Sequence, residues 1–549
     1  MKRDLRKLSD RSFDVAVVGG GIYGVSIARD AALRGLAIAL VEKEDFGGAT
    51  SANSHKIVHG GLRYLQHADL RRMRESIHER SALLRIAPHL VRPQAFLMPT
   101  YGHGLRGREV LCVALGLNDL LSLGRNRALE PARHIPSGCV VSRSECLRLA
   151  PGILEEGLTG GALWHDGLML NSERLLFAIL RSAIDAGAEA ANYAEATEIL
   201  LHGGRAEGIR VRDAFSEERF EIRARVIVNA AGPWSLGGLG PPQPTSAIRL
   251  AKAMNLVTRP ILGEHAIGVA RRSREARGAV RSDRRLFFLV PWRDRTLIGT
   301  AYFPYDGAPD GFAITEPEIE RFLEEVNWSY PPARLSRADV RLVHGGLVPV
   351  VGSRDADADV ELATRYQIRD HAAEGLEGMI TVTGVKYTTA RGVAEAAVDR
   401  VSSKLGAETS RSRSAELPVW GGDIERVEEY VAREAEALRP GVTANTVRRL
   451  VTHYGSRHRE VLAEVGGDEQ RLKPIADGTE VTGAEVTFAV RREMAAKLAD
   501  VVFRRTDLGA AGHPGDPALV AAAALVAQEL GWDEARIESE LAEVRRRFP

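Results

Sequence analysis

Three glycines near the amino terminus have the spacing of a dinucleotide-binding turn, Gly19-x-Gly21-x-x-Gly24. They follow an apolar run over residues 13–18, and an acidic residue, Glu42, stands eighteen residues after Gly24. In such a turn the first glycine permits the tight bend, the second lets the backbone approach a pyrophosphate, and the third lets helix pack on strand. The helix that follows presents N–H groups to the phosphates, and the acid accepts hydrogen bonds from ribose hydroxyls. The pattern therefore predicts a bound dinucleotide.

The elements that must position this turn form a strand–helix–strand unit. Apolar residues recur at helical spacing from Val25 to Gly35, and a second apolar strand over 38–41 ends at Glu42. Further strand-like runs are 225–232, 286–292, 296–300 and 379–384. Short apolar runs that end in small residues, such as 225–232, are typical of a buried parallel sheet. We therefore expect 225–232 and 379–384 to return to the sheet of the first unit.

One later segment favours FAD over a nicotinamide cofactor. The strand over 226–232 runs into Pro233-Trp234, which resembles the second strand-turn that FAD proteins of this class place beside the cofactor. A permanently bound flavin that oxidises its substrate directly is the simplest arrangement, because the flavin carries the chemistry and the protein positions it. We therefore predict FAD as the cofactor.

The order of these segments predicts an α/β fold with a discontinuous, Rossmann-like FAD-binding domain, an inserted β-rich substrate domain and a C-terminal all-α domain. The FAD-binding domain is assigned to residues 12–75, 165–240 and 340–401, the substrate or cap domain to 76–164 and 241–339, a linker to 402–421, and the helical domain to 422–549. The linker assignment rests on a stretch rich in Ser, Arg, Lys and Glu. The helical assignment rests on Ala, Glu, Arg and Leu at helical periodicity.

Composition narrows the functional class. The 549 residues are 44% hydrophobic and 27% charged, with a net charge of +1, so the basic excess of a nucleic-acid-binding protein is missing. Cys112, Cys139 and Cys146 form no CxxC pair and cannot all be bridged internally, which favours a reducing compartment and argues against a metal site. The sequence has no apolar signal segment and no run of about 18 apolar residues. We therefore expect a cytoplasmic protein that binds no nucleic acid.

A longer stretch carries a more specific pattern. Residues 49–66 read ATSANSHKIVHGGLRYLQ. This stretch resembles the signature ATSS-x-SSK-x-IHGGLRYLE of the FAD-dependent glycerol-3-phosphate dehydrogenases, and its departures are Ala52, Asn53, His55 and Gln66. Further blocks that match the family in order are 79–90, 229–234, 291–300, 384–391, 453–455 and 504–506. The resemblance covers nearly the whole chain, and the blocks 59–64 and 384–391 are its most specific parts.

The resemblance implies a set of residues around the flavin. Small residues such as Ser51 and Gly60 would let the backbone run close to the flat isoalloxazine ring, and Gly384 would face it from the other side. The predicted cofactor-binding residues are Gly19, Gly21, Ile22, Tyr23, Gly24, Glu42, Lys43, Thr50, Ser51, Ser54, His55, Lys56, His59, Gly60, Gly61, Ala231, Gly232, Gly384, Lys386 and Thr388.

The resemblance also implies a phosphate-binding group. Arg63, Tyr64 and Lys386 would hold the phosphate of the substrate, and Arg365 would lie nearby. The planar fork of an arginine grips a phosphate with two hydrogen bonds, and a lysine adds a point charge. The predicted catalytic residues are His59, Arg63 and Lys386. His59 is either a general base or a hydrogen-bonded neighbour of the flavin.

Two positions depart from the family where its members face the substrate. The family has an arginine in a GVRP-type turn, where this chain has Val348, and a histidine in a KGSH segment, where this chain has Asn255. Val348 offers none of the five donors of an arginine. We therefore predict that Asn255 contacts a substrate that differs from the family's, or that another residue, such as His344, serves as the base.

The leading hypothesis for function is oxidation of sn-glycerol 3-phosphate to dihydroxyacetone phosphate. The C2 hydrogen would leave as hydride to flavin N5, and the electrons would pass to quinone or another acceptor. The first alternative is the same chemistry on another polyol phosphate or a 2-hydroxy acid. The second is a flavin-binding sensor without turnover.

Two surfaces are candidates for contacts with partners. The segment 105–121 has basic residues at its start and then a dense apolar stretch. It is too short to span a bilayer, so it either lies at a membrane surface, which would make the protein peripheral, or forms an ordinary buried helix. The C-terminal helical domain is the candidate for a homodimer contact.

Overall fold

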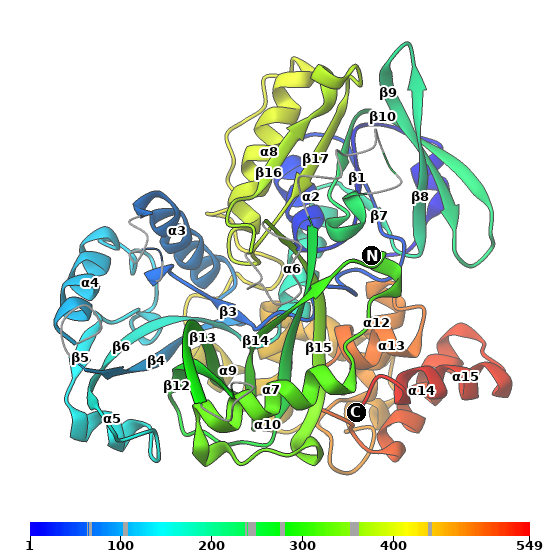
Figure 1. Cartoon of the computed structure of the whole chain (residues 1–549). Coiled ribbons are helices and arrows are strands. Elements are labelled where there is room, and N and C mark those ends of the chain that lie inside the picture. Colours follow the sequence, from blue (N-terminus) through cyan, green and yellow to red (C-terminus); the bar gives the residue numbers. More distant parts are fainter. Residues whose placement is uncertain are drawn as a thin grey trace.

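The structure is a computed structural model that describes residues 1–62, 64, 69–102, 108–236, 239, 249–274, 280–351, 362–437 and 442–549. Two sheets and a group of C-terminal helices make up this described part (Figure 1). In Figure 1 the first sheet stands above the second, and the C-terminal helices, drawn in orange to red, lie beside the second sheet. Among the described helices, none combines the length and the apolar content that crossing a bilayer requires.

The first sheet contains the predicted strand–helix–strand unit. Its strand order is β16-β17-β10-β1-β2-β7, and β8 and β9 form a hairpin that extends from β10. The strands are β1 (Ser12–Val18), β2 (Ile38–Val41), β7 (Glu189–Ala191), β8 (Ala194–His202), β9 (Arg205–Asp213), β10 (Arg219–Asn229), β16 (Gln367–Asp370) and β17 (Met379–Thr383). β1 pairs in parallel with β2 and β10, and β10 pairs in parallel with β17. Both later runs therefore return to the first sheet, as predicted.

The apolar runs of these strands follow from burial on both faces. Val15 and Val17 belong to a core with α2 (Ile22–Leu33), α6 (Ser172–Asp185) and α8 (Ala390–Leu405). Ala16 and Val18, on the opposite face, pack with α1 (Leu5–Ser9) and with the β8–β9 hairpin. A parallel strand covered on both sides has no polar face to present, so its sequence shows no alternation.

The second sheet has the order β15-β11-β14-β13-β12-β4-β6-β3, with β5 paired to β6. Its strands are β3 (Ile57–Val58), β4 (Val91–Tyr101), β5 (Cys139–Val141), β6 (Leu158–Met169), β11 (Arg249–Thr258), β12 (Ala266–Arg274), β13 (Val280–Trp292), β14 (Arg295–Tyr305) and β15 (Val340–Val350). Helix α7 (Glu316–Ser329) packs on it through Phe322 and Val326, which share a core with Leu289. Its other helices are α3 (Leu70–Ile86), α4 (Arg108–Leu121) and α5 (Arg143–Leu149).

Strand pairing corrects three of the predicted domain boundaries. Residues 340–350 were assigned to the FAD-binding domain, but β15 pairs with β11 in the second sheet. Residues 165–169 belong to β6 of that sheet, and residues 57–58 form β3 at its edge. The error has a physical reason: a strand-like run indicates a strand, but it carries no information on which sheet the strand joins.

The C-terminal helices form cores of their own. They are α9 (Val427–Glu436), α10 (Ala444–Tyr454), α11 (His458–Ala463), α12 (Gly483–Glu493), α13 (Leu498–Asp500), α14 (Asp516–Leu530) and α15 (Glu534–Arg545), with a π-helical turn over Val501–Arg505. Apolar side chains such as Val486, Leu519 and Val544 pack together at one end of this domain. Leu450, Tyr454 and Phe488 do so at the other.

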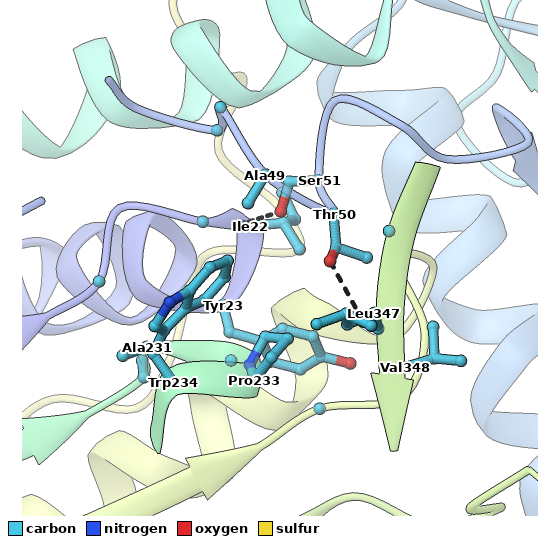
Figure 2. Close-up of a pocket in the computed structure, with 18 of the residues that line it drawn as sticks. Ile22, Tyr23, Ala49, Thr50, Ser51, Ala231, Pro233, Trp234, Leu347 and Val348 are labelled. Atoms are coloured by element: carbon cyan, nitrogen blue, oxygen red, sulfur yellow. Dashed lines mark hydrogen bonds between the residues drawn. The ribbon is translucent and has the colours of Figure 1, made fainter. Parts of the chain in front are cut away.

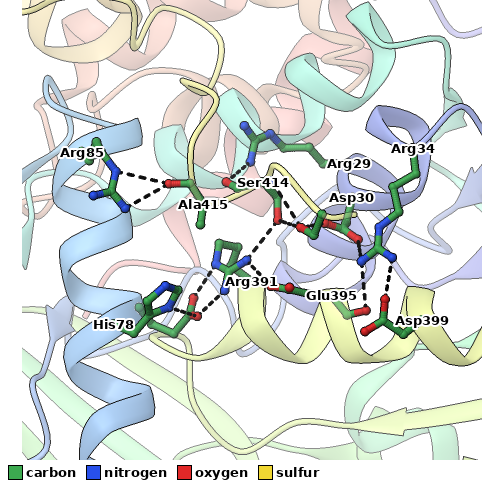
Figure 3. A network of polar contacts seen from close by, with 12 residues as sticks. Arg29, Asp30, Arg34, His78, Arg85, Arg391, Glu395, Asp399, Ser414 and Ala415 are labelled. Atoms are coloured by element: carbon green, nitrogen blue, oxygen red, sulfur yellow. Dashed lines mark hydrogen bonds and ion pairs between the residues drawn. The ribbon is translucent and has the colours of Figure 1, made fainter. Parts of the chain in front are cut away.

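The predicted linker is an ordered segment rather than a loose connection. Helix α8 continues to Leu405, and the residues after it lie against α2 and α3. Arg29 on α2 donates to the carbonyl oxygen of Ser414 at 2.9 Å, and Arg85 on α3 donates to that of Ala415 (Figure 3). Val419 then donates its N–H to Ile86 at 2.9 Å. These contacts fasten the segment at several points before the C-terminal domain begins.

Candidate active site

A cavity of about 610 Å³ lies where the two sheets meet. The carboxyl ends of β1, β2, β10 and β17 line one side of it, and β11, β14 and β15 line the other. In open α/β sheets, ligands bind outside the carboxyl ends of the parallel strands. Figure 2 shows how Tyr23 and Thr50 from the first part of the fold lie near Leu347 and Val348 on β15, while Trp234 lies beside Ala231 on the other side of Tyr23.

Two of the three fingerprint glycines, Gly19 and Gly24, have the structural reasons that the sequence predicts. Gly19 adopts a φ of +104°, and a Cβ there would lie 2.7 Å from the carbonyl oxygen of Ala230. A Cβ on Gly24 would lie 1.8 Å from the carbonyl oxygen of Gly19, so helix α2 could not pack on β1. Gly21 is the N-cap of α2 and has no capping side chain, which leaves that helix end open to the cavity.

Glu42 stands at the end of β2 and is held by backbone. Its Oε2 accepts from Gly20 N at 2.6 Å, and its Oε1 accepts from Glu44 N at 3.0 Å. Burial raises the pKa of the Glu42 carboxyl, and these two N–H groups counteract part of that effect. The carboxyl lines the cavity next to Lys43. An acid fixed at this place fits the predicted contact with ribose hydroxyls.

The segment after Glu42 forms a wall of the cavity. Thr50, Ser51, Ser54 and His55 all line it. Ser51 Oγ accepts from Ile22 N at 3.0 Å, and Thr50 Oγ1 donates to the carbonyl oxygen of Leu347 at 3.2 Å (Figure 2). The Thr50 bond joins the wall to β15 of the second sheet. Burial lowers the pKa of His55 to about 4, so its imidazole is neutral near pH 7.

Lys56 lies away from this wall, which corrects the prediction that it contacts the cofactor. Its ammonium is buried and donates to Ser172 Oγ at 2.8 Å and to Glu173 Oε1 at 3.0 Å. It therefore anchors the segment to the start of α6. A lysine in a cofactor motif and a lysine in a buried ion pair have the same appearance in a sequence.

The block 59–64 was predicted to include flavin contacts, and its described residues lie outside the cavity lining. A Cβ on Gly60 would lie 2.3 Å from a guanidinium nitrogen of Arg80, and one on Gly61 would lie 2.6 Å from the Tyr64 ring. Close side chains therefore already account for the two glycines. Gly60 N also donates to Asp166 Oδ1 at 2.6 Å. Arg63 lies outside the described residues.

Lys386 and Tyr64, predicted to share the substrate phosphate, lie together. The Lys386 ammonium is 4.2 Å from the centroid of the Tyr64 ring, and the Arg72 guanidinium carbon is 5.0 Å from it. Arg72 also donates to the carbonyl oxygen of Thr364 at 3.1 Å, which brings Arg365 to the same region. Hydrogen bonds from Arg72 lower the pKa of Asp69, and the charge of Arg365 adds to this effect. Lys386 lines the cavity, whereas Tyr64 and Arg365 lie outside its lining.

Tyr23 explains how Lys386 is presented. Its hydroxyl donates to the Lys386 carbonyl oxygen at 2.6 Å and accepts from Val385 N and Lys386 N, both at 3.1 Å. A Cβ on Gly384 would lie 1.9 Å from the Tyr23 ring, so only glycine fits there. Helix α2 therefore fixes the turn that carries Lys386. Thr388 follows this turn, and its side chain is buried outside the cavity lining.

The opposite wall is neutral at the two positions that depart from the family. Asn255 Nδ2 donates to the Asn53 carbonyl oxygen at 3.0 Å, and its Oδ1 accepts from Thr300 Oγ1 at 2.8 Å. Asn255 and Val348 both line the cavity. His344 pairs with Asn255 across β11 and β15, but it is buried outside the lining, and burial lowers its pKa well below the usual value. Its burial and its lowered pKa therefore do not support His344 as the base.

Comparisons with known proteins decide the family. A family model described as FAD dependent oxidoreductase matches residues 14–400, and one described as the C-terminal domain of alpha-glycerophosphate oxidase matches residues 412–537. The chain is 30% identical over 548 residues to the glycerol-3-phosphate dehydrogenase of Synechocystis sp., which covers 98% of this chain and 97% of that protein. It belongs to the family of FAD-dependent glycerol-3-phosphate dehydrogenases. The resemblance inferred from the motifs is thus confirmed.

Two more family members agree. Glycerol-3-phosphate dehydrogenase 2 of Mycobacterium tuberculosis is 31% identical over 542 residues, with 98% of this chain and 88% of that protein covered. The crystal structure of the glycerol-3-phosphate dehydrogenase from Bacillus halodurans complexed with FAD aligns with a TM-score of 0.73 at 24% identity, over 99% of this chain and 95% of that one. The predicted fold class and the predicted FAD cofactor are both confirmed.

The cavity of this family member fits FAD on its own geometry. The glycine turn leaves room for a pyrophosphate at the start of α2, since a Cβ on Gly21 would meet only Ser51 Oγ, at 3.2 Å. Glu42 is fixed where a ribose would lie, and Ala231, Gly232 and Gly384 leave space along the other ends of the strands. FAD supplies the acceptor for a substrate hydride.

The sequence did not predict one cluster in the cavity lining, formed by Lys43, Asp310 and Trp234. Lys43 Nζ lies 2.6 Å from Asp310 Oδ1 and 4.4 Å from the centroid of the Trp234 ring, and Trp234 Nε1 donates to the same oxygen at 2.6 Å. Asp310 follows β14, so the cluster joins the second sheet to the ends of β2 and β10. No motif marks Asp310, because its partners are far away in the chain.

Proposed function

We propose that this enzyme oxidises sn-glycerol 3-phosphate to dihydroxyacetone phosphate, with FAD as the hydride acceptor. The names of its relatives support this substrate. The observation in the fold that carries the proposal is the meeting of Lys386 with Tyr64 at the edge of the FAD cavity. An ammonium beside a phenol suits one end of a small substrate that bears a phosphate.

Each side chain in this group has a task that its chemistry allows. Lys386 attracts the phosphate as a point charge, and Tyr64 offers a hydroxyl donor. Arg63 and Arg365 are proposed to complete the grip, since an arginine fork matches two phosphate oxygens. Asn255, oriented by Thr300 and Asn53, is proposed to direct its amide toward the uncharged end of the substrate.

We propose His59, which is half-buried beside Tyr64 and outside the cavity lining, as the proton acceptor. Its ring packs edge-on against Tyr64, with the centroids 6.1 Å apart and the planes at 71°. An imidazole nitrogen of His59 would take the C2 hydroxyl proton while the C2 hydrogen leaves as hydride. His55 lines the cavity but has a pKa lowered to about 4 by burial, so it is a weaker base near pH 7.

Val348 and Asn255 favour one second candidate, the same chemistry on another polyol phosphate. Val348 stands where the family pattern has an arginine, and Asn255 stands where it has a histidine, so the part of the wall that they form is uncharged. Such a wall accepts a neutral polyol chain more readily than the carboxylate of a 2-hydroxy acid, because burying an unpaired charge is costly.

Anaerobic bleaching of the flavin tests these assignments. The holoenzyme is mixed with sn-glycerol 3-phosphate, other polyol phosphates and 2-hydroxy acids, and the flavin absorbance is followed. We expect bleaching by sn-glycerol 3-phosphate. Bleaching only by another polyol phosphate would establish the second candidate. A flavin that no substrate bleaches would reject turnover and leave the sensor hypothesis.

We further propose that the enzyme is peripheral at the membrane and passes its electrons to quinone. Val113, Leu117 and Leu120 on α4 are 73%, 37% and 61% exposed, and Val110 and Leu123 are 40% and 78% exposed. The spacing of three or four residues between Val110, Val113, Leu117 and Leu120 places these four on one helix face, and Leu123 lies in the turn that follows α4. A large exposed apolar face marks an interaction surface, and a helix of this kind can lie in a bilayer interface. Residues 105–107 of the predicted segment lie outside the described residues.

A further inference from the structure

The C-terminal domain contacts the cavity wall through one carboxylate. Asp45 follows Glu42 by three residues, lines the cavity and is only 2% exposed. Arg505 donates to it through Nη1 and Nη2, each at 2.6 Å, and Arg504 donates to it through Nε. Asn192 Nδ2 adds a fourth bond at 2.9 Å. Two arginines of the helical domain thus bind one residue of the loop over residues 42–51, here called the cofactor loop.

A departure from α-helical geometry delivers both guanidinium groups. The helical domain enters this region through α13 and then widens into the π-helical turn Val501–Arg505. Asp500 begins that turn and accepts from Arg504 at 2.6 Å and from Tyr193 OH at 2.7 Å. Single π-helical turns are rare, and they are frequent at functional sites. Here the turn places two consecutive arginines on the same carboxylate.

The loop that Asp45 belongs to carries the cavity wall. Gly47 N donates to the Gly20 carbonyl oxygen at 3.0 Å, and Tyr193 N donates to the Glu44 carbonyl oxygen at 2.8 Å. Residues Glu42–Asp45 and Gly47–Ser51 line the cavity. Any displacement of Asp45 therefore moves the turn beside the fingerprint and the acid that faces the ribose site.

Removal of the Asp45 charge leaves the buried Arg505 guanidinium without its carboxylate partner. Burial raises the pKa of Asp45, but the charges of Arg505 and Arg504 outweigh burial and leave that pKa lowered. The Arg505 guanidinium also lies 3.9 Å from the centroid of the Phe177 ring on α6 and donates to the Glu493 carbonyl oxygen at 3.0 Å. Buried pairs with such geometry resist local opening, because breaking one partner is strongly unfavourable.

We propose that the C-terminal domain serves as a cofactor-retention device, in which Arg505 and Arg504 hold Asp45 and thereby set the affinity for FAD. Asp45 and Arg505 are positioning residues: they act through the loop and are not assigned contacts with the cofactor. The proposal rests on FAD as the family cofactor, and it is independent of which substrate the enzyme oxidises.

A matched carboxylate in the same domain provides the control. Glu529 on α14 is also bonded by two arginines, since Arg471 Nη1 donates to its Oε1 at 2.7 Å and Arg491 Nε donates to its Oε2 at 2.5 Å. All three of these residues belong to the C-terminal domain and lie outside the cavity lining. Glu529→Gln therefore weakens the domain by a similar change without reaching the cofactor loop.

The test is the dissociation constant of FAD from the full-length chain. FAD is titrated into the apoproteins of wild type, Asp45→Asn, Arg505→Lys and Glu529→Gln, and binding is followed by flavin fluorescence. We expect the constant to rise at least tenfold in Asp45→Asn and Arg505→Lys and to stay within twofold in Glu529→Gln. The gain in melting temperature on adding FAD should shrink in the first two variants only.

A purely structural role gives a different pattern. The proposal is overturned if Asp45→Asn and Arg505→Lys both keep the dissociation constant of FAD within twofold of wild type. It is also overturned if Glu529→Gln raises that constant as much as they do. Should Asp45→Asn yield no folded protein, Arg505→Lys, which keeps the positive charge, decides by the same thresholds.

Discussion

Glu79 on α3 accepts hydrogen bonds from Arg391 on α8, with Nε to Oε2 at 2.8 Å and Nη2 to Oε1 at 2.5 Å. Both side chains are buried. Helix α3 begins shortly after Tyr64, and α8 begins shortly after Lys386. The pair therefore connects the two helices that follow Tyr64 and Lys386, the residues proposed to bind the substrate phosphate.

Glu79→Gln should weaken the ion pair between α3 and α8 and make the proposed phosphate-binding residues Tyr64 and Lys386 less well positioned. Breaking a buried ion pair costs about 3–5 kcal/mol, so the melting temperature should fall. We also expect KM for sn-glycerol 3-phosphate to rise more than kcat falls, because the substrate grip is lost before the chemistry. Steady-state kinetics and thermal scans check this. His78→Ala, which removes the exposed neighbour bonded to Glu79, is the control and should leave KM within about twofold.

Lys386→Met should remove the point charge at the cavity edge. A hydrogen bond to a charged group contributes about 1.5–3 kcal/mol, which corresponds to roughly a 10- to 150-fold loss in kcat/KM. The flavin absorbance spectrum should be retained, since the backbone of Lys386 still binds Tyr23. Turnover equal to that of wild type would show that the substrate phosphate binds elsewhere.

His59→Asn should remove the proton acceptor and lower kcat by about 10²–10⁴-fold. His55→Asn is the matched comparison, because it changes the other imidazole of the same segment and leaves His59 in place. We expect the second variant to lose much less activity, with FAD still bound in both. The reverse order of the two effects would assign the proton transfer to His55.

Stability should fall as the pH is lowered from about 6.5 toward 3, partly because of His89. Burial lowers the pKa of His89 to about 3, and neither of its ring nitrogens has a hydrogen-bond partner among the described residues. The unfolded chain binds the proton below its ordinary pKa of about 6.5, whereas the folded chain does not. Protonation of His89 therefore leaves the free energy of unfolding unchanged above about pH 6.5 and lowers it as the pH falls toward 3.

His89→Leu should flatten this acid slope by up to roughly 1.4 kcal/mol per pH unit, the value for one proton. Urea midpoints measured from pH 4 to pH 7 at constant FAD give the slope. His202→Gln changes an exposed histidine and should leave the slope as it is in wild type. An unchanged slope in His89→Leu would mean that the acid sensitivity arises elsewhere.

Val113→Glu with Leu120→Glu should abolish binding to liposomes if α4 contacts the bilayer. A charge on each exposed apolar position removes the favourable burial and adds repulsion from anionic lipid. Sedimentation with vesicles of mixed neutral and anionic lipid measures the bound fraction. Leu201→Glu serves as the control, because Leu201 is 58% exposed and its strand β8 lies far from α4 (Figure 1). A wild-type protein that stays in the supernatant would favour an acceptor other than membrane quinone.

The sequence predicts the dinucleotide site well because its parts are close in the chain and each has a single purpose. Gly24 is explained by its contact with the Gly19 carbonyl oxygen within one strand–helix unit, Gly19 by its positive φ, and Glu42 directly follows the next strand. The same directness holds for Lys386, whose block could be matched as a whole.

Partners that are distant in the chain are what the sequence could not predict. Whether β15 joined the first or the second sheet depended on β11, which lies about ninety residues earlier. Lys56 was placed with the cofactor because Glu173, its partner, belongs to a helix that no motif linked to it. Asp310 and Arg505 were missed as neighbours of the cavity wall for the same reason.

The bond between Asp45 and Arg505 joins residues that are 460 positions apart. Ribosomes add roughly 5–20 residues per second, so Asp45 waits on the order of half a minute or longer for its partner to be made. Strand β1 can pair with β10 only after β10 has been synthesised, and β10 can pair with β17 only after β17 has been synthesised, so the parallel sheet is completed late. A nascent chain thus exposes the fingerprint long before it can form the bonds from Arg505 to Asp45.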